Sequence, residues 1–278
     1  MTKPPLVSVV VPAMNEAECL PKLLDELTTV CHPLGYHFEF LFIDDGSTDD
    51  TVDVLAGLRR RDERVKYLSL SRNFGHQAAL SAGLAHASGD AVIMMDGDLQ
   101  HPPVLIPDLL ERWRAGYDVV NTVRLETARI SPAKKLWSRL FYATFNALAN
   151  VRVEPGGADF RLMSRAAVAA LNDLPERQRF LRGLVPWIGF RQARVEFRAP
   201  ARWAGKTKYT FRRNFRFALE GITAFSFYPL RMVTTLGVLI ALGPGAGVLA
   251  AGLRVFASWP MPGWTPRRWP CSFSPAAS

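Results

Sequence analysis

The sequence AVIMMDGDLQHPP, at Ala91–Pro103, joins an apolar run to a pair of carboxylates. The run Ala91–Met95 predicts a buried strand, and Asp96 and Asp98 follow it with Gly97 between them. Two carboxylates at this spacing can converge on one hard cation shared with a phosphate-bearing ligand, so Mg²⁺ or Mn²⁺ is expected. A simple acidic turn is the alternative. The preceding strand favours the cation site, because open α/β sheets bind ligands outside the carboxyl ends of their strands.

A regular alternation of strands and helices leads up to this stretch. Strands are predicted at Leu6–Val11, Phe38–Ile43 and Val65–Ser69, and helices at 16–30, 51–61 and 71–90. The order β-α-β-α-β-α-β predicts an α/β fold with a largely parallel, doubly wound sheet. The carboxyl ends of the first, second and fourth strands then meet at one edge, where such sheets bind nucleotides.

The loops at this edge are polar but carry no phosphate-binding glycine motif. Neither GxGxxG nor GxxxxGK[ST] follows a predicted strand, so the metal is expected to carry a nucleotide's diphosphate. Asn15 is expected to cap the first helix, and Ser47 or Thr48 the second. Asp45 is not required for capping and is therefore a candidate site residue. His101 is either a further metal ligand or part of a rigid loop with the two prolines that follow it.

The composition indicates a folded protein with an anionic partner. Of 278 residues, 49% are hydrophobic, and 34 Lys and Arg against 25 acidic residues give a formal charge of +9. Nucleic acid, anionic lipid and phosphorylated substrates all fit this excess. The three cysteines have no metal-type spacing, which favours a reducing compartment. No export signal is predicted at the N-terminus.

The second half of the chain contains patterns typical of membrane association. Residues 133–151 and 210–231 combine apolar, aromatic and basic side chains, which predicts two helices at a membrane surface. Ordinary core-facing helices are the alternative. Met232–Leu253 carries no charged side chain and is long enough to span a bilayer. The tail at 258–278 is rich in Pro, Arg and Ser, which predicts an aberrant or truncated end.

Further charged residues complete the candidate site. Asp159 lies in GGADFR, where a loop carboxylate against apolar packing would have a raised pKa and could act as a base. A turn or cap residue is the alternative. Arg124 ends a predicted strand and can stabilise a leaving diphosphate, or it is a solvated surface residue. Arg177, Arg179 and Arg182 form either a phosphate-binding cluster near a lipid surface or ordinary solvated charges.

Several motifs, taken together, resemble those of one enzyme family. The chain is similar to the inverting glycosyltransferases of family 2 in VSVVVPAMNEAECLPKLL, FIDDGSTDDT, LSRNFGHQAALSAGL and MDGDLQHPP. It most resembles the polyprenyl-phosphate branch, which includes dolichol-phosphate mannose synthase and bactoprenol glucosyltransferase. The resemblance extends from about Val7 to about Leu236. Met14 departs from it, because an aromatic residue is usual there, so altered nucleobase packing is expected.

The resemblance implies a GT-A-type fold and a set of site residues. The implied nucleotide-sugar contacts are Pro12, Met14, Glu16, Ile43, Asp45, Asp96, Gly97, Asp98, Gln100, Arg124, Arg202 and Lys208. Asp96 and Asp98 would hold the metal on the diphosphate, and Asp159 and Asp98 would be the catalytic residues. Arg202 and Lys208 match an RxxGxxK segment that would close over donor diphosphate or acceptor phosphate.

The resemblance also implies partners and location. One sugar would move from a nucleotide-sugar to polyprenyl phosphate with Mg²⁺ or Mn²⁺, UDP-glucose being the first choice ahead of other UDP-sugars and GDP-mannose. The enzyme would lie at the inner cell membrane, in contact with membrane lipid, with its catalytic domain on the cytoplasmic side. Homo-oligomers are a family expectation. The expected domains are catalytic at 1–209, an interface helix at 210–231 and a transmembrane segment at 232–257.

Three other functions fit parts of the sequence. A processive polysaccharide synthase of the same fold would carry a QxxRW segment and more spanning helices, and the sequence contains neither. A non-catalytic, membrane-anchored nucleotide-sugar-binding subunit fits the unusual tail but not the intact acidic residues. A nucleic-acid-binding protein rests on net charge alone, since no nucleic-acid motif accompanies it, so no nucleic-acid partner is expected.

Overall fold

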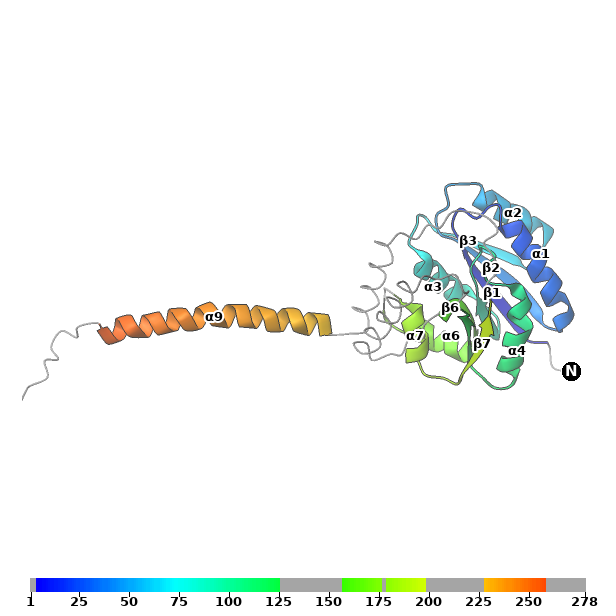
Figure 1. Ribbon diagram of the computed structural model, residues 1–278. Helices are drawn as coiled ribbons and strands as arrows, with labels where there is room; N and C mark the ends of the chain where they lie inside the picture. Colours follow the sequence, from blue (N-terminus) through cyan, green and yellow to red (C-terminus); the bar gives the residue numbers. More distant parts are fainter. Residues whose placement is uncertain (1–3, 126–156, 177–178, 199–227, 259–278) are drawn as a thin grey trace, which may run out of the picture. The chain divides into compact units, whose positions relative to one another are not determined.

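The computed structural model describes residues 4–125, 157–176, 179–198 and 228–258 (Figure 1). Contacts within the chain divide it into two units, Met1–Ser226 and Phe227–Ser278. The strands of the first unit are β1 (Leu6–Ala13), β2 (His37–Asp44), β3 (Val65–Ser69), β4 (Ala91–Met94), β5 (Val119–Arg124), β6 (Gly157–Ser164) and β7 (Gln192–Phe197). They form one seven-stranded sheet in the order β3-β2-β1-β4-β6-β5-β7.

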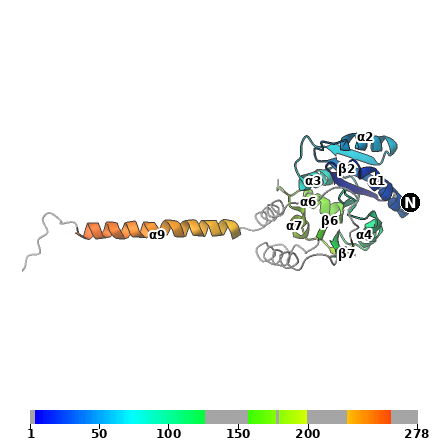
Figure 2. The same cartoon turned by 45° about the horizontal axis from the view of Figure 1, so that its top comes forward.

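Helices cover both faces of this sheet (Figures 1 and 2). The helices described in the first unit are α1 (Leu20–Cys31), α2 (Thr51–Arg61), α3 (His76–His86), α4 (Ile106–Arg114), α6 (Arg165–Asn172) and α7 (Leu181–Trp187), with short 3₁₀ turns at His32–Leu34 and Pro103–Leu105. α1, α2 and α4 pack on one face, and α3, α6 and α7 on the other. The central strands are therefore buried on both sides, which explains their continuous apolar sequences.

The predicted α/β class with a largely parallel, doubly wound sheet is confirmed. β6 is the exception within the described sheet, because it runs antiparallel to both of its neighbours, β4 and β5. Its amino end therefore lies at the same edge as the carboxyl ends of the parallel strands. The pairing joins Met94 to Arg161, so Asp96, two residues after Met94, and Asp159, two residues before Arg161, both lie at this edge.

The loops that follow β1 and β2 differ from the capping predictions. α1 begins only at Leu20 and α2 at Thr51, and neither has a side-chain cap bond. The Asn15 backbone N–H instead donates to Ser47 Oγ at 2.9 Å, and Asn15 Oδ1 accepts from the Thr48 N–H at 2.8 Å. The predicted caps were therefore wrong, because these side chains join two neighbouring strand ends to each other.

β1 is longer than predicted and includes Pro12, which pairs in register with Ile43 of β2. The proline is tolerated because the pairing of β1 with β4 ends at Val10, so no ladder bond to that strand is needed at position 12. The extension carries the strand to Ala13, level with Asp44 at the end of β2.

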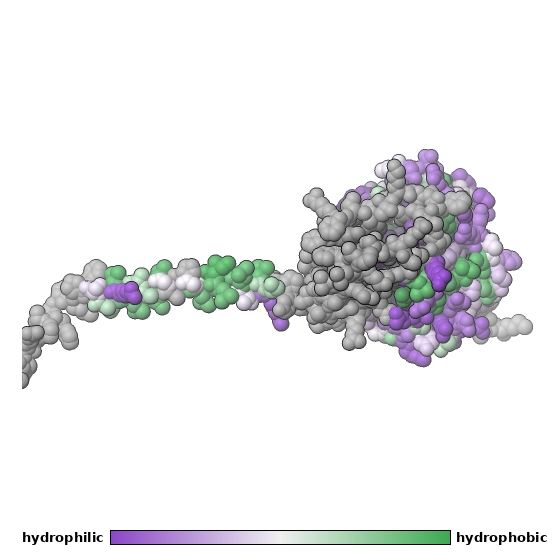
Figure 3. Space-filling view, in the orientation of Figure 1, coloured by the Kyte–Doolittle hydropathy of each residue, from purple (hydrophilic) through white to green (hydrophobic). Residues whose placement is uncertain are grey.

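The second unit contains one long helix, α9 (Tyr228–Ser258). The predicted apolar segment Met232–Leu253 lies inside it, and Leu230–Ser258 is long and apolar enough to cross a membrane. Most of its visible surface is hydrophobic (Figure 3). The predicted helix 133–151, most of 210–231 and the tail after Ser258 lie outside the described residues.

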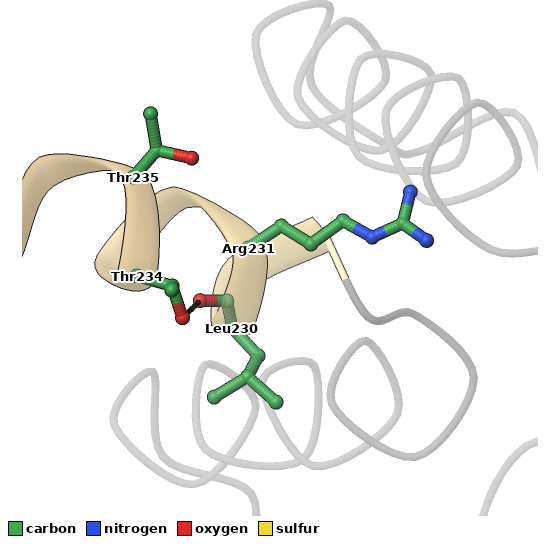
Figure 4. Close-up of a pocket in the computed structure, with 4 residues that line it drawn as sticks. All are labelled: Leu230, Arg231, Thr234 and Thr235. Atoms are coloured by element: carbon green, nitrogen blue, oxygen red, sulfur yellow. Dashed lines mark hydrogen bonds between the residues drawn. The ribbon is translucent and has the colours of Figure 1, made fainter. Parts of the chain in front are cut away.

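The first turns of α9 line a pocket, here called the hollow (Figure 4). It is lined by Leu230, Arg231, Thr234 and Thr235, and the Thr234 hydroxyl donates to the Leu230 carbonyl at 2.9 Å. This bond satisfies the threonine within its own helix. Among the described residues, the lining of the hollow includes no predicted site residue, so the chemistry considered below is argued from the sheet edge.

Candidate active site

The loop after β4 presents Asp96 and Asp98 at the carboxyl edge of the sheet. The Asp96 backbone N–H donates to His101 Nδ1 at 2.9 Å, and Asp98 Oδ1 accepts from the Gln100 N–H at 3.1 Å. The buried His101 ring also stacks on Phe160, with centroids 5.3 Å apart. Because its Nδ1 accepts a hydrogen bond from the Asp96 N–H, His101 stabilises the loop. This favours the prediction that it is part of a rigid loop over the prediction that it is a metal ligand.

Asp96 has an unsatisfied oxygen that suits a cation. Its Oδ1 is buried and forms no hydrogen bond with the described residues. A buried carboxylate oxygen without a hydrogen bond is costly, and a bound cation would offset that cost beside His76 Nε2, which lies 3.4 Å from this oxygen. No group of three or more His, Cys, Asp or Glu side chains forms a metal cage within the described ranges. Two carboxylates completed by a ligand's phosphate oxygens and water are the usual donor set for Mg²⁺, so the residues fit a metal bound together with a diphosphate.

Asp159 is the most strongly paired carboxylate of the site. Arg182 Nε and Nη2 donate to its two oxygens, each at 3.0 Å, and Arg161 Nη2 lies 3.6 Å away. Burial alone would raise the pKa of Asp159, but Arg182, His76 and Arg161 hold it well below its usual range. The prediction of a loop carboxylate with a raised pKa was therefore wrong. Asp159 lies in β6 and is a fixed anion, because cations surround it.

His76 is a site residue that the sequence reasoning missed. Its Nε2 lies 3.4 Å from Asp96 Oδ1 and 3.5 Å from Asp159 Oδ2, between the two carboxylates. Burial opposes protonation of the imidazole, but the hydrogen bond to Asp159 and the charge of Asp96 outweigh it and raise the pKa of His76. The only signal in the sequence was a histidine placed directly after a glycine within the predicted helix 71–90.

Asp45 holds the loop that leads to His76. Its carboxylate accepts from the Phe74 N–H at 2.8 Å and from the Gly75 N–H at 3.0 Å. Gly46 has φ +69°, and a Cβ there would lie 2.4 Å from the backbone carbon of Arg72, so glycine is needed for the two loops to meet. The predicted base contact of Asp45 stays a prediction, beside this structural role.

The site thus combines two acidic residues of one loop, a carboxylate oxygen without a hydrogen bond among the described residues, and a cationic group at the same sheet edge. The sequence profile of glycosyl transferase family 2 matches residues 8–171. The chain belongs to glycosyl transferase family 2. It is 40% identical over 236 residues to an uncharacterized glycosyltransferase from Synechocystis, with 85% of this chain and 74% of that protein covered. It is also 40% identical to the prophage bactoprenol glucosyl transferase homolog of Escherichia coli K12, with 84% and 77% covered.

Solved structures agree with the fold. Glucosyl-3-phosphoglycerate synthase from Mycobacterium tuberculosis, in complex with Mn²⁺, UDP and phosphoglyceric acid, superposes with a TM-score of 0.55 at 21% identity. The match covers 78% of this chain and 76% of that one. The predicted GT-A-type architecture is therefore confirmed, and the chain is a glycosyltransferase.

The glycosyltransferase brings several other predicted site residues to the same edge. Arg124, at the end of β5, donates from Nη1 to Gln100 Oε1 at 3.2 Å. Met14 Sδ accepts from Asn73 Nδ2 at 2.6 Å, so the methionine contacts the loop before α3. The Glu16 backbone N–H donates to Thr51 Oγ1 at 3.1 Å, at the start of α2. Ile43 is buried at the end of β2 beside Pro12.

The predicted arginine cluster of the glycosyltransferase is divided between two environments. Arg182 pairs with Asp159, whereas Arg179 Nη2 donates to the carbonyls of Asn172 and Leu174, at 3.0 and 3.1 Å. Arg179 thus closes the carboxyl end of α6, which gives it a structural role that the sequence did not suggest. Its lipid-phosphate role stays a prediction. Arg177, Arg202 and Lys208 lie outside the described residues.

Proposed function

We propose that this glycosyltransferase moves one glucose from UDP-glucose to a polyprenyl phosphate, with inversion at the anomeric carbon. Support comes from the bactoprenol glucosyl transferase homolog named above and from the arrangement of charges at the sheet edge. The observation that carries the proposal is the pairing of β4 with antiparallel β6, which brings Asp96 and the Asp159–Arg182 ion pair to opposite sides of one histidine, His76. A donor diphosphate and an acceptor phosphate need sites of these two kinds.

Asp96 and Asp98 would hold a divalent metal at the donor end. Mg²⁺ or Mn²⁺ in that position neutralises charge that develops on the departing nucleoside diphosphate. Arg124 and Gln100 lie in hydrogen-bond contact beside this loop, where the guanidinium can bind a diphosphate oxygen. Asp96 Oδ1 is buried and has no hydrogen bond among the described residues, so it can accept a cation beside the His76 imidazole that lies 3.4 Å away.

Asp159 would act at the acceptor end by orienting Arg182. The attacking oxygen of a polyprenyl phosphate already carries negative charge, so no general base is needed to remove a proton. A carboxylate whose pKa is held well below its usual range is a weak base, but it is a strong anchor for a guanidinium. Inversion follows when the acceptor oxygen approaches the sugar on the face opposite the leaving diphosphate.

A membrane location completes the proposal. α9 has the length and composition of a membrane-spanning helix, and a polyprenyl acceptor is available only in a bilayer. We place the enzyme at the inner cell membrane, with the catalytic unit on the cytoplasmic side where nucleotide-sugars are made. Arg177, Arg202 and Lys208 remain candidate phosphate contacts on the strength of the sequence alone.

The donor can be identified by parallel transfer assays. Membranes containing the full chain are supplied with undecaprenyl phosphate, Mg²⁺ or Mn²⁺, and radiolabelled UDP-glucose or GDP-mannose. The proposal predicts label in the lipid extract from UDP-glucose and little from GDP-mannose. Label in the lipid extract from GDP-mannose alone would identify GDP-mannose, and not UDP-glucose, as the donor. Metal-dependent binding of UDP-glucose without any transfer would contradict the proposal and favour a non-catalytic nucleotide-sugar-binding subunit.

A further inference from the structure

His76 occupies the narrow space between the two ends of the site. It is the first residue of α3, and its Nε2 lies within 3.4 to 3.5 Å of one oxygen from each of Asp96 and Asp159. These two carboxylates would repel each other across the paired strands without a donor between them. The imidazole side chain is 34% exposed, so it borders solvent at the open side of the site and is not a core residue.

The backbone holds His76 in this place from the side of β2. Gly75, immediately before it, donates its N–H to Asp45 Oδ2 at 3.0 Å. Asp45 is itself buried directly after β2, so a buried carboxylate attaches the start of α3 to the sheet edge. The position of the imidazole therefore depends on the sheet and not on a mobile surface loop.

A second connection joins the start of α3 to the start of α7. The Leu181 backbone N–H donates to Gln77 Oε1 at 2.9 Å. Gln77 directly follows His76, and Leu181 directly precedes Arg182. The bond therefore joins the neighbours of the two residues that contact the Asp159 carboxylate. Asp159 thus receives Arg182 from α7 and His76 from α3, with the two helices bonded to each other.

We propose that His76 is a positioning residue for the transfer reaction, which holds Asp159, and through it Arg182, at a fixed separation from the metal-site carboxylate Asp96. The role rests on the proposed function, since it sets the distance between the diphosphate end and the acceptor end. In-line transfer requires both ends to be fixed within a fraction of an ångström, and small displacements cost large factors in rate. His76 acts through the two carboxylates and has no separate chemical role.

The test compares turnover of the full chain carrying His76→Ala, His76→Gln, Asp159→Asn or the His76→Ala/Asp159→Asn pair. Loss of the imidazole should lower kcat about 10- to 100-fold, the range typical of residues that orient a site's ligands, with KM for UDP-glucose changed less than about threefold. Gln offers an amide donor of similar reach and should restore most of kcat. In the Asp159→Asn background, His76→Ala should cause little further loss, because the residue it positions is already disabled.

His86 provides the matched control. It lies at the other end of the same helix, is exposed, and bonds only within α3, to the Ala82 carbonyl at 2.8 Å, among the described contacts. His86→Ala should leave kcat and KM at wild-type values. A wild-type kcat in His76→Ala would overturn the proposal. It would also be overturned if the fold-losses in kcat of the two single variants multiplied fully in the double variant, because His76 would then act independently of Asp159.

Unfolding measurements separate this inference from the proposed function. Urea unfolding of the same four variants in detergent should show coupling, the double variant losing less stability than the sum of the two single variants. If the losses in unfolding free energy were additive, the proposed interaction between His76 and Asp159 would be contradicted, whether or not transfer is detected. Coupling together with no transfer from any donor in the wild type would count against the proposed function alone.

Discussion

Asp159 is held as an anion by cationic groups from three elements, and this predicts how its loss will affect the reaction. Its lowered pKa keeps it ionised at every pH above its ordinary value of 3.8, so it does not titrate in the assayed range. Asp159→Asn should reduce kcat about 100-fold, since Arg182 loses its anchor. The acidic limb of the pH profile of kcat/KM should keep its wild-type shape at the lower level, and any limb due to His76 should move to lower pH, because the hydrogen bond to Asp159 helps to raise the pKa of that histidine. Disappearance of an acidic limb in the variant would show that Asp159 accepts a proton, contrary to the account.

The buried Glu39 carboxylate, which lies away from the site, gives a second prediction. Its carboxylate accepts hydrogen bonds from Ser8, Ser88 and Lys66. Burial alone would raise the pKa of Glu39, but these bonds lower it from its ordinary value of 4.5. The stabilisation is therefore complete above about pH 4.5 and is lost as the pH falls through the lowered folded pKa.

Glu39→Gln should cost about 1–3 kcal/mol of unfolding free energy at pH 7, because buried partners lose a charged acceptor. The cost should shrink as the pH is lowered from 7 to 3 in a series of urea titrations, since protonated Glu39 resembles Gln. Lys66→Ala is the comparison, and because that side chain is 52% exposed its removal should cost less than about 1 kcal/mol. A cost of Glu39→Gln that stays constant with pH would refute the assigned cause.

At the scale of elements, the packing of α3 decides where His76 lies. A Cβ at Gly83 of α3 would lie 2.2 Å from Val10 Cγ1 and 3.1 Å from Ile43 Cγ1, so the helix contacts β1 and β2 directly. Gly83→Ala should therefore destabilise the chain by about 1–3 kcal/mol and lower kcat, despite the better helix propensity of Ala. Gly57 in α2 has only Arg60 Nη2 at 4.0 Å, and Gly57→Ala should stabilise by up to about 1 kcal/mol. If urea unfolding showed that both substitutions stabilise the chain, or that both destabilise it, this account of the packing would be contradicted.

The elements also explain which parts of the site the sequence could predict. Apolar runs that end in acidic residues located the carboxyl edge, because parallel strands fix where their ends meet. The partners of Asp159 were not predictable, since β6 runs antiparallel and residues as distant as His76 and Arg182 meet there only through helix packing. The capping predictions for Asn15 and Ser47 were wrong for the same reason, because tertiary bonds between loops replaced local ones.

At the scale of the whole molecule, α9 predicts integral attachment to a membrane. Leu239 and Leu242 lie near the middle of this helix and are exposed on it. Replacing both with Arg should cost about 3 kcal/mol at each position in a bilayer. The wild-type chain should stay with the membrane pellet after alkaline carbonate extraction, and the double variant should move to the supernatant. Complete release of the wild type would contradict a spanning role.

The most direct test of the account measures label transferred from UDP-glucose into extractable polyprenyl lipid by the wild type and by Asp98→Ala. The account predicts lipid-linked glucose that is abolished by EDTA, restored by Mg²⁺ or Mn²⁺, and absent in the Asp98→Ala variant. Undiminished transfer by Asp98→Ala, or by the wild type in EDTA, would contradict a metal-bound diphosphate at the Asp96–Asp98 loop.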